Sequence, residues 1–339
     1  MLYILVIAVL LWEGFSFYRS FYQTYEKTVH ASVGRSLALS QVMNPEALSK
    51  IPGGEVHLMF FGDIMLSRSV GKKMVELNDF RYPFLSVASK TQEVDIAFAN
   101  LENPISNRGK NQGSIYSFRA DPRTVEGLVH AGFDVVSLAN NHMWDWGRDA
   151  LEDTINILKQ ANIQGVGAGK NEEEANRPVI TRKKGVSFGF LAYTNLMPES
   201  LNARGDSPGL SSFEEEKAKL DIQKLRSEVD IVVVSMHWGE EYKTESNDAQ
   251  KGLARGFIDA GADLVIGHHP HVIQEVEQYK NGWIAYSLGN FIFDQNFSLA
   301  TREGLGVLVT VRGGRVTSLE RQNVLISTDF QPSLNTLSQ

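Results

Sequence analysis

Short apolar runs alternate with amphipathic stretches along most of the chain. The apolar runs are rich in β-branched residues and cover 56–61, 94–99, 134–139, 186–192, 230–236, 262–266 and 283–288. Between them lie segments of helical length and spacing, including 122–131, 148–161, 213–227 and 249–260. This alternation predicts an α/β fold whose strands are buried on both faces. Two further runs, 304–311 and 315–319, flank Gly313 and Gly314 and predict a closing β-hairpin.

The chain begins with an apolar run over residues 1–11, which Trp12 and several aromatic residues extend. The run is shorter than the roughly 20 residues that cross a bilayer. No small-x-small cleavage pattern follows it, which favours an uncleaved signal anchor. We therefore expect the chain to divide into a membrane anchor or signal segment (1–24), a tether (25–54), one folded domain (55–325) and a C-terminal tail (326–339).

Charges around the expected anchor give conflicting signals on its orientation. Arg19 and Lys27 follow the apolar run and no basic residue precedes it, which by the positive-inside rule would place the domain in the cytoplasm. A start site assigned too far downstream would explain the missing basic flank, and we expect a single anchor in the cell membrane with the domain outside the cytoplasm. The alternative is a buried N-terminal helix of a soluble protein.

Composition excludes several kinds of site. The net charge of −7 gives no reason to expect nucleic-acid binding, which rests on basic patches, so no nucleic-acid partner is expected. An anionic polymer would have to be bound by local clusters of cations. Because the chain has no cysteine, disulfides and thiolate metal sites are excluded, and a metal ion would need imidazole, carboxylate or amide ligands.

Polar residues collect where five of the predicted strands end, which is where ligand sites form in open α/β sheets. These positions hold Asp63, Asn100, Glu102, Asn140, Asn141, His142, His237, His268, His269 and His271. Imidazole together with carboxylate and amide oxygen suits Mn²⁺, Zn²⁺ or Fe. Glycines at 62, 239 and 267 permit tight turns beside such ligands. Taken singly, Asp63 is equally compatible with a turn, and a histidine such as His142 is more often structural. Three histidines in four residues, at positions 268, 269 and 271, indicate a site.

At these positions the sequence resembles the poly-γ-glutamate capsule biosynthesis (CapA) family, which is similar to the calcineurin-like metallophosphoesterases. The shared motifs follow one order over residues 55–325, namely 61–65, 100–104, 139–142, 166–169, 237–242, 246–248, 267–271 and 286–291. The resemblance implies a four-layer α-β-β-α sandwich.

The resemblance also implies a role for each motif. Asp63 would bind a first metal ion, Glu102 would take the bridging position, and Asn141 with His237 would hold a second ion. His269 and His271 fit the spaced histidine pair of the last motif, and His142 would be the cation or general acid beside the leaving group. Residues expected to contact the substrate or to support the ligands are Asn100, Asn140, Glu241, His268 and Asn290.

Two positions depart from the phosphoesterases of this fold. Met65 stands where those enzymes carry a histidine, and Glu102 stands where they usually carry an aspartate. The CapA family shares both changes. Because Met65 replaces a histidine, the first metal position is short of one ligand. The expected cofactor is one or two ions of Mn²⁺, Zn²⁺ or Fe.

The resemblance implies a membrane-bound component of poly-γ-glutamate synthesis or export, which acts with other subunits of a synthase and with the anionic polymer. We expect a metal-dependent, hydrolase-like subunit. Two alternatives stay open. One is a non-catalytic scaffold that binds the polymer, and the other is a phosphoesterase acting on a different cell-envelope substrate. Met65 favours the scaffold over the phosphoesterase.

Overall fold

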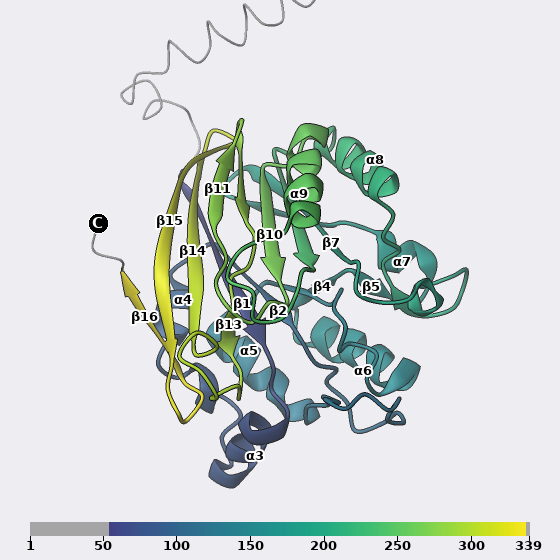
Figure 1. Cartoon of the computed structure of the whole chain (residues 1–339), viewed down its shortest axis with the longest axis vertical. Helices are drawn as coiled ribbons and strands as arrows, with labels where there is room; N and C mark the ends of the chain where they lie inside the picture. Colours follow the sequence, from purple (N-terminus) through teal and green to yellow (C-terminus); the bar gives the residue numbers. More distant parts are fainter. Residues whose placement is uncertain (1–53, 337–339) are drawn as a thin grey trace, which may run out of the picture. The chain divides into compact units, whose positions relative to one another are not determined.

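The computed structural model describes residues 54–336, which form two large β-sheets and a short two-stranded one (Figure 1). One sheet has the strand order β16-β15-β14-β1-β2-β3-β4, and β13 also pairs with β1. The strands of this first sheet are β1 (Val56–Ile64), β2 (Ile96–Leu101), β3 (Val135–Ser137), β4 (Gln164–Val166), β13 (Asn290–Ile292), β14 (Glu303–Arg312), β15 (Arg315–Ile326) and β16 (Pro332–Thr336).

The second sheet has the order β11-β12-β10-β9-β7-β6. Its strands are β6 (Val179–Lys183), β7 (Val186–Thr194), β9 (Ile231–His237), β10 (Leu264–His268), β11 (Val276–Tyr279) and β12 (Gly282–Ala285). A separate short pair joins β5 (Ala168–Gly169) to β8 (Gly209–Leu210).

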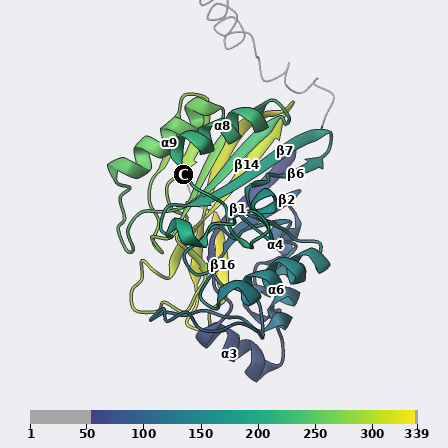
Figure 2. The same cartoon turned by 90° about the vertical axis from the view of Figure 1, so that its right-hand side faces the viewer.

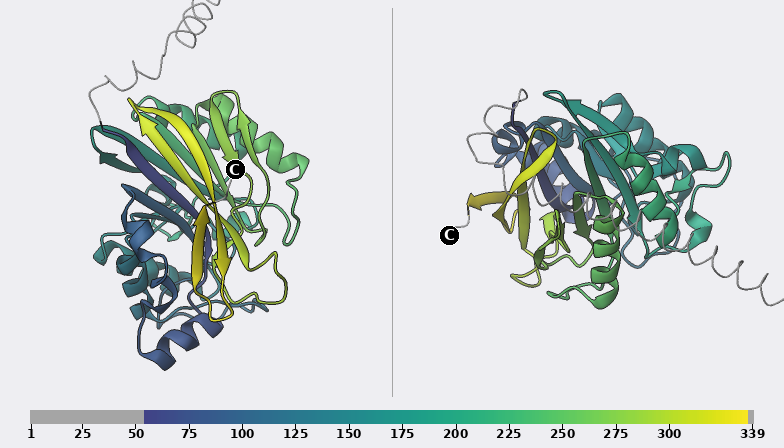
Figure 3. Two further views of the ribbon diagram at one scale, coloured as in Figure 1. Left: turned by 90° about the vertical axis from the view of Figure 1, so that its left-hand side faces the viewer. Right: turned by 90° about the horizontal axis from the view of Figure 1, so that it is seen from above.

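Helices cover the outer face of each sheet. The first sheet is covered by α3 (Arg68–Leu77), α4 (Ala88–Gln92), α5 (Val125–Ala131) and α6 (Gly147–Gln160), and the second by α8 (Glu215–Arg226) and α9 (Asp248–Ala260). A short helix, α7 (Glu172–Asn176), packs on β5. Figure 2 shows α8 and α9 on one side of the strands and α3 and α6 on the other, and Figure 3 gives two further views.

Three apolar clusters fill the spaces between the layers. Phe61 of β1 packs towards the helices of the first sheet, whereas its neighbour Phe60 points into the space between the sheets. In that space the rings of Phe98 and Phe190 stack at 5.8 Å between centroids. Phe257 of α9 belongs to the third cluster, on the outer face of the second sheet. The predicted four-layer α-β-β-α sandwich is therefore confirmed.

Most predicted element ends agree with the structure to within a few residues, but β15 runs on to Ile326, well beyond the predicted 315–319. The predicted closing hairpin is present as β14 and β15, which pair antiparallel from Glu303 to Arg312. The sheet also continues into the segment expected to be a C-terminal tail, because β16 pairs antiparallel with β15 from Gln322 to Ile326.

The expected anchor (1–24) and, apart from Gly54, the expected tether (25–54) lie outside the described residues. Across residues 54–336, the structure contains no helix with both the length and the apolar character that crossing a bilayer requires.

Parallel pairing brings the candidate residues to one edge of the sheets. Asp63 in β1 lies opposite Asn100 of β2 on one side and Asn290 of β13 on the other. In the second sheet, His268 of β10 lies opposite His237 of β9. The carboxyl ends of these strands thus supply the framework on which the site is built.

Candidate metal centre

Asp63 and Glu102 lie side by side and are both fully buried. The amide nitrogen of Asn100 joins them, since it donates to Asp63 Oδ1 at 2.8 Å and to Glu102 Oε2 at 3.3 Å. Asn100 is itself held by Asn140, whose Nδ2 donates to Asn100 Oδ1 at 3.0 Å. The second oxygen of Asp63 accepts from the backbone N–H of His269 at 3.2 Å.

Glu102 keeps one oxygen free of any hydrogen bond within residues 54–336, although the atom is buried. This Oε1 atom lies 3.6 Å from Nε2 of His271 and 3.8 Å from Nε2 of His142. A buried carboxylate oxygen without a donor is costly. A metal ion bound between these side chains would satisfy it, so the donor set fits a cation.

His237, at the end of β9, faces the same carboxylates. Its Nε2 lies 2.7 Å from Oδ1 of Asn141, and its Nδ1 lies 3.3 Å from Nδ2 of Asn100. Its ring centroid is 4.9 Å from that of His269. One atom from each of Asp63, Glu102 and His237 can be chosen so that all three lie within 4.8 Å of one another.

The three clustered histidines separate into two environments. His268 is fully buried, and neither of its ring nitrogens makes a hydrogen bond in the described part of the chain, although Nδ1 lies 3.3 Å from Asp63 Oδ1. His269 and His271 lie in the turn beyond β10 and have left-handed backbone angles, with φ of 99° and 57°. Such angles are strained for residues other than glycine and occur often at functional sites.

A second group of possible ligands forms around this turn. His269, His271 and Glu241 each offer an atom within 4.8 Å of the others. His271 is oriented by Asn290, whose Oδ1 lies 3.0 Å from His271 Nδ1. From the sequence, Glu241 was expected only to contact the substrate or to support the metal ligands. The structure places it beside two histidines that the resemblance assigned to metal binding.

Burial and mutual charge perturb the ionisation of these groups. Burial, followed by the charge of Asp63, raises the pKa of Glu102 well above its usual range. Burial acts to raise the pKa of Asp63 as well, but the nearby imidazole rings of His268 and His271 outweigh it and hold this pKa well below the usual range. Burial and neighbouring histidine charge lower the pKa of His237, and lower the pKa of His269 to about 3, so both rings are neutral and retain a lone pair.

His142 is held at the edge of the centre by two residues that the sequence did not single out. Its Nδ1 lies 2.8 Å from Oδ2 of Asp145, and its ring stacks on Phe118 at 4.0 Å between centroids. Asp145 follows His142 by three residues, and this spacing was the one signal available from the sequence. These contacts leave Nε2 of His142 directed towards the carboxylates.

Met65 does not take part in the centre as a donor. The side chain is fully buried in the apolar cluster between the first sheet and its helices. Its sulfur accepts from the backbone N–H of Ser67 at 3.2 Å and from the Ser67 hydroxyl at 3.0 Å. The position at which phosphoesterases of this fold carry a histidine is thus used here for packing and a local turn.

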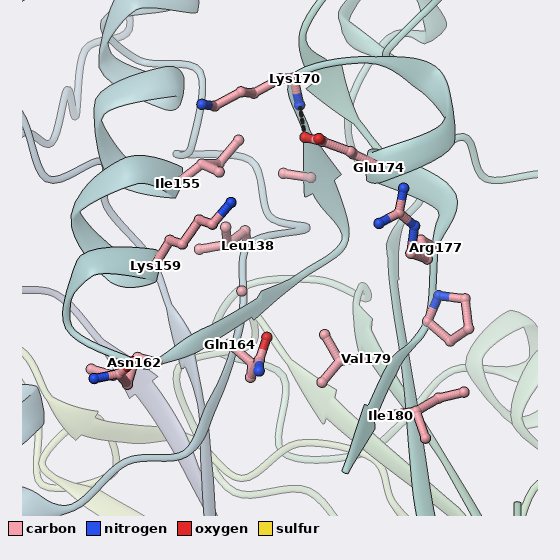
Figure 4. A pocket seen from close by; sticks show the side chains of 14 residues that line it. Leu138, Ile155, Lys159, Asn162, Gln164, Lys170, Glu174, Arg177, Val179 and Ile180 are labelled. Atoms are coloured by element: carbon pink, nitrogen blue, oxygen red, sulfur yellow. Dashed lines mark hydrogen bonds between the residues drawn. The ribbon is translucent and has the colours of Figure 1, made fainter.

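One pocket borders the centre and a larger one lies apart from it. The pocket at the centre, of about 210 Å³, is bordered by His142, Glu241 and His271 together with Arg68 and Asp294. The larger pocket, of about 550 Å³, shares no lining residue with the centre (Figure 4). Figure 4 shows Lys159, Lys170 and Arg177 around it, together with apolar side chains that include Ile155 and Val179.

Comparison with known proteins gives a consistent assignment. The family model described as "Bacterial capsule synthesis protein PGA_cap" matches residues 57–295. The chain is 35% identical over 274 residues to the capsule biosynthesis protein CapA of Bacillus anthracis, which covers 77% of this chain and 66% of that protein. It is also 35% identical over 242 residues to the PGA biosynthesis protein CapA of Bacillus subtilis, which covers 70% of this chain and 63% of that protein.

The match thus spans slightly less than two thirds of the length of these two relatives. Among solved structures, a hypothetical protein from Thermus thermophilus is similar with a TM-score of 0.50 and 16% identity, covering 79% of this chain and 98% of that one. This last similarity concerns the fold alone.

Proposed function

The chain belongs to the bacterial capsule synthesis protein PGA_cap family, and on that basis we propose that it serves poly-γ-glutamate synthesis or export through a metal-dependent, hydrolase-like centre. In this proposal residues 1–24 anchor the chain in the cell membrane, and the domain works outside the cytoplasm with other subunits of a synthase. The relatives named for capsule and PGA biosynthesis support the choice of polymer.

One observation carries the enzymatic part of the proposal. Asp63, Glu102 and His237 come from three different strands or strand ends, and all three are buried with their potential ligand atoms close together. Two buried carboxylates at hydrogen-bonding distance from one shared amide repel each other unless a cation or proton intervenes. Packing alone does not account for such an arrangement.

The residues divide between holding a metal ion and handling a proton. Asp63, Glu102, Asn141, His237, His269 and His271 would hold one or two ions of Mn²⁺, Zn²⁺ or Fe, which suit imidazole and oxygen donors. A bound ion would polarise a phosphoryl or γ-glutamyl carbonyl oxygen of the substrate. Asp145 fixes the Nδ1 side of His142, so Nε2 is the atom that would exchange a proton with the leaving group.

A second candidate, the non-catalytic scaffold, is favoured by the pocket in Figure 4. An acidic protein needs local cations to bind a polyanion, and this pocket has Lys159, Lys170 and Arg177 beside apolar side chains. Poly-γ-glutamate combines carboxylates with methylene groups, so both parts of the pocket have a complement in the polymer. Glu174 also borders the pocket and accepts from the Lys170 backbone N–H at 3.2 Å, which offsets part of the positive charge.

A cleavage assay separates the two candidates. Purified full-length protein loaded with Mn²⁺ would be given poly-γ-glutamate and, separately, a generic phosphodiester. We expect the polymer to be shortened, and we expect His142→Ala to slow this about 100-fold, as befits loss of a proton-transfer group. The matched control is His130→Ala, because His130 lies on α5 outside the centre.

The contrary results are distinct. The scaffold hypothesis would be favoured over the enzyme hypothesis by two results together. The wild type would not cleave the polymer, and it would bind labelled polymer more tightly than the double variant Lys159→Ala/Arg177→Ala does. Cleavage of the phosphodiester alone would favour a phosphoesterase acting on another envelope substrate.

A further inference from the structure

The centre lacks a donor at the position of Met65, as its sulfur already accepts two hydrogen bonds from Ser67. A thioether is also a soft ligand, poorly suited to the metals that imidazole and carboxylate prefer. A divalent ion next to His269 and His271 has the carboxylates of Asp63 and Glu102 close by, since these lie 3.4 and 3.6 Å from ring nitrogens of His271. It would still need one more donor in place of the side chain at position 65.

Glu241 is in the right place to supply it. The residue lies in the loop between β9 and α9, and its carboxylate has an atom within 4.8 Å of ring nitrogens of both His269 and His271. Its neighbour Tyr242 donates its backbone N–H to the carbonyl of Pro270 at 2.8 Å. A backbone hydrogen bond thus joins the loop that carries the carboxylate to the turn that carries the two histidines.

The backbone on both sides of this contact is strained. Tyr242 has a φ of 65°, and His269 and His271 have φ of 99° and 57°. Conformations of this kind are unfavourable for residues other than glycine and persist only where surrounding contacts impose them. Three such residues next to one another indicate that the two loops are held in a specific relative position.

An independent observation points to a ligand at the same place. Nδ1 of His269 is buried and makes no hydrogen bond anywhere in residues 54–336, while the side chain as a whole is only 8% exposed. Burying a polar nitrogen without a partner is unfavourable. A metal ion accepting the lone pair of this nitrogen would remove the penalty.

We propose that Glu241 is a metal ligand, which together with His269 and His271 completes a site for a borderline divalent cation beside Asp63, Glu102 and His237. The proposal rests on the metal centre of the proposed function and adds to it the donor that Met65 does not provide. It also explains why one exposed carboxylate of this loop lies against buried imidazoles.

Glu240 offers a matched control. It precedes Glu241 directly, carries the same charge and is also exposed, but it does not belong to either group of potential ligands. Both Glu241→Gln and Glu240→Gln keep the side-chain size and alter no packed core. A difference between the two variants therefore reports on ligation and not on net charge or folding.

The test is binding of Mn²⁺ alone and Zn²⁺ alone to full-length protein, measured by equilibrium dialysis with elemental analysis. We expect Glu241→Gln to lose one ion per chain or to weaken its Kd at least about 10-fold, with Glu240→Gln equal to wild type. Wild-type affinity and stoichiometry in Glu241→Gln would overturn the role of Glu241 alone. Wild-type protein that binds neither ion would overturn this proposal and the metal-dependent form of the proposed function together.

Discussion

Two histidines of the centre are each held through one ring nitrogen, while the other ring nitrogen faces the carboxylates. His142 is held through Nδ1 by Asp145, and His271 through Nδ1 by Asn290. In both rings Nε2 lies within 4 Å of the free oxygen of Glu102. Carboxylate or amide partners of this kind set the orientation and tautomer of metal-binding histidines. The two rings are therefore oriented in advance for binding a metal ion or transferring a proton at Nε2.

A substitution at Met65 tests whether this position belongs to the core or to the centre. Met65→His should lower the free energy of unfolding by about 1–3 kcal/mol, since it places a polar ring among apolar side chains and removes the acceptor for Ser67. Metal affinity should stay at the wild-type value. Urea unfolding and Mn²⁺ binding would measure the two effects.

Met65→Leu serves as the control for this prediction. It keeps the apolar volume and should cost less than about 1.5 kcal/mol. If Met65→His instead tightened metal binding while keeping wild-type stability, the side chain would have access to the ions, and the account of Met65 as a core residue would be wrong.

At the scale of elements, glycines allow the strand ends to approach one another. Gly62 and Gly267 were expected to provide tight turns, but both lie within strands, β1 and β10. A Cβ at Gly62 would lie 1.9 Å from the carbonyl oxygen of Gly289, and one at Gly267 would lie 1.9 Å from that of Tyr286. Gly239 does have a positive φ, of 86°, as a turn requires. Close packing of backbones, more than turn geometry, brings Asp63 and His268 into position.

This leads to a prediction about Gly62. Gly62→Ala should destabilise the protein by at least about 2–3 kcal/mol, because the clash is with backbone atoms that cannot rotate away. It should also disturb Asp63, the next residue. Gly252→Ala is the control, because this exposed helix position has open space around it among the described residues, and alanine there should stabilise by about 0.5–1 kcal/mol. Thermal unfolding that ranked the two variants equally would contradict the packing argument.

For the molecule as a whole, the sequence predicted most of the strands and helices that have a regular pattern of apolar and polar residues. The buried strands, the main helices and the closing hairpin follow from alternation of apolar and polar residues, and the polar residues at strand ends follow from the parallel sheet. Strands such as β13 and β16 were not predicted, since each is five residues or fewer and is defined by pairing with a strand distant in sequence or by a short return of the chain. The position of Glu241 beside His269 likewise depends on loop contacts that periodicity does not encode.

The central claim concerns the whole fold, since five strand ends from two sheets must meet to form one metal centre. Anomalous diffraction from crystals grown with Mn²⁺ tests it most directly. The account predicts manganese peaks between Asp63, Glu102 and His237 and beside His269 and His271, with the free oxygen of Glu102 facing an ion. Crystals at saturating Mn²⁺ that show these side chains ordered, with no manganese peak among them, would contradict it.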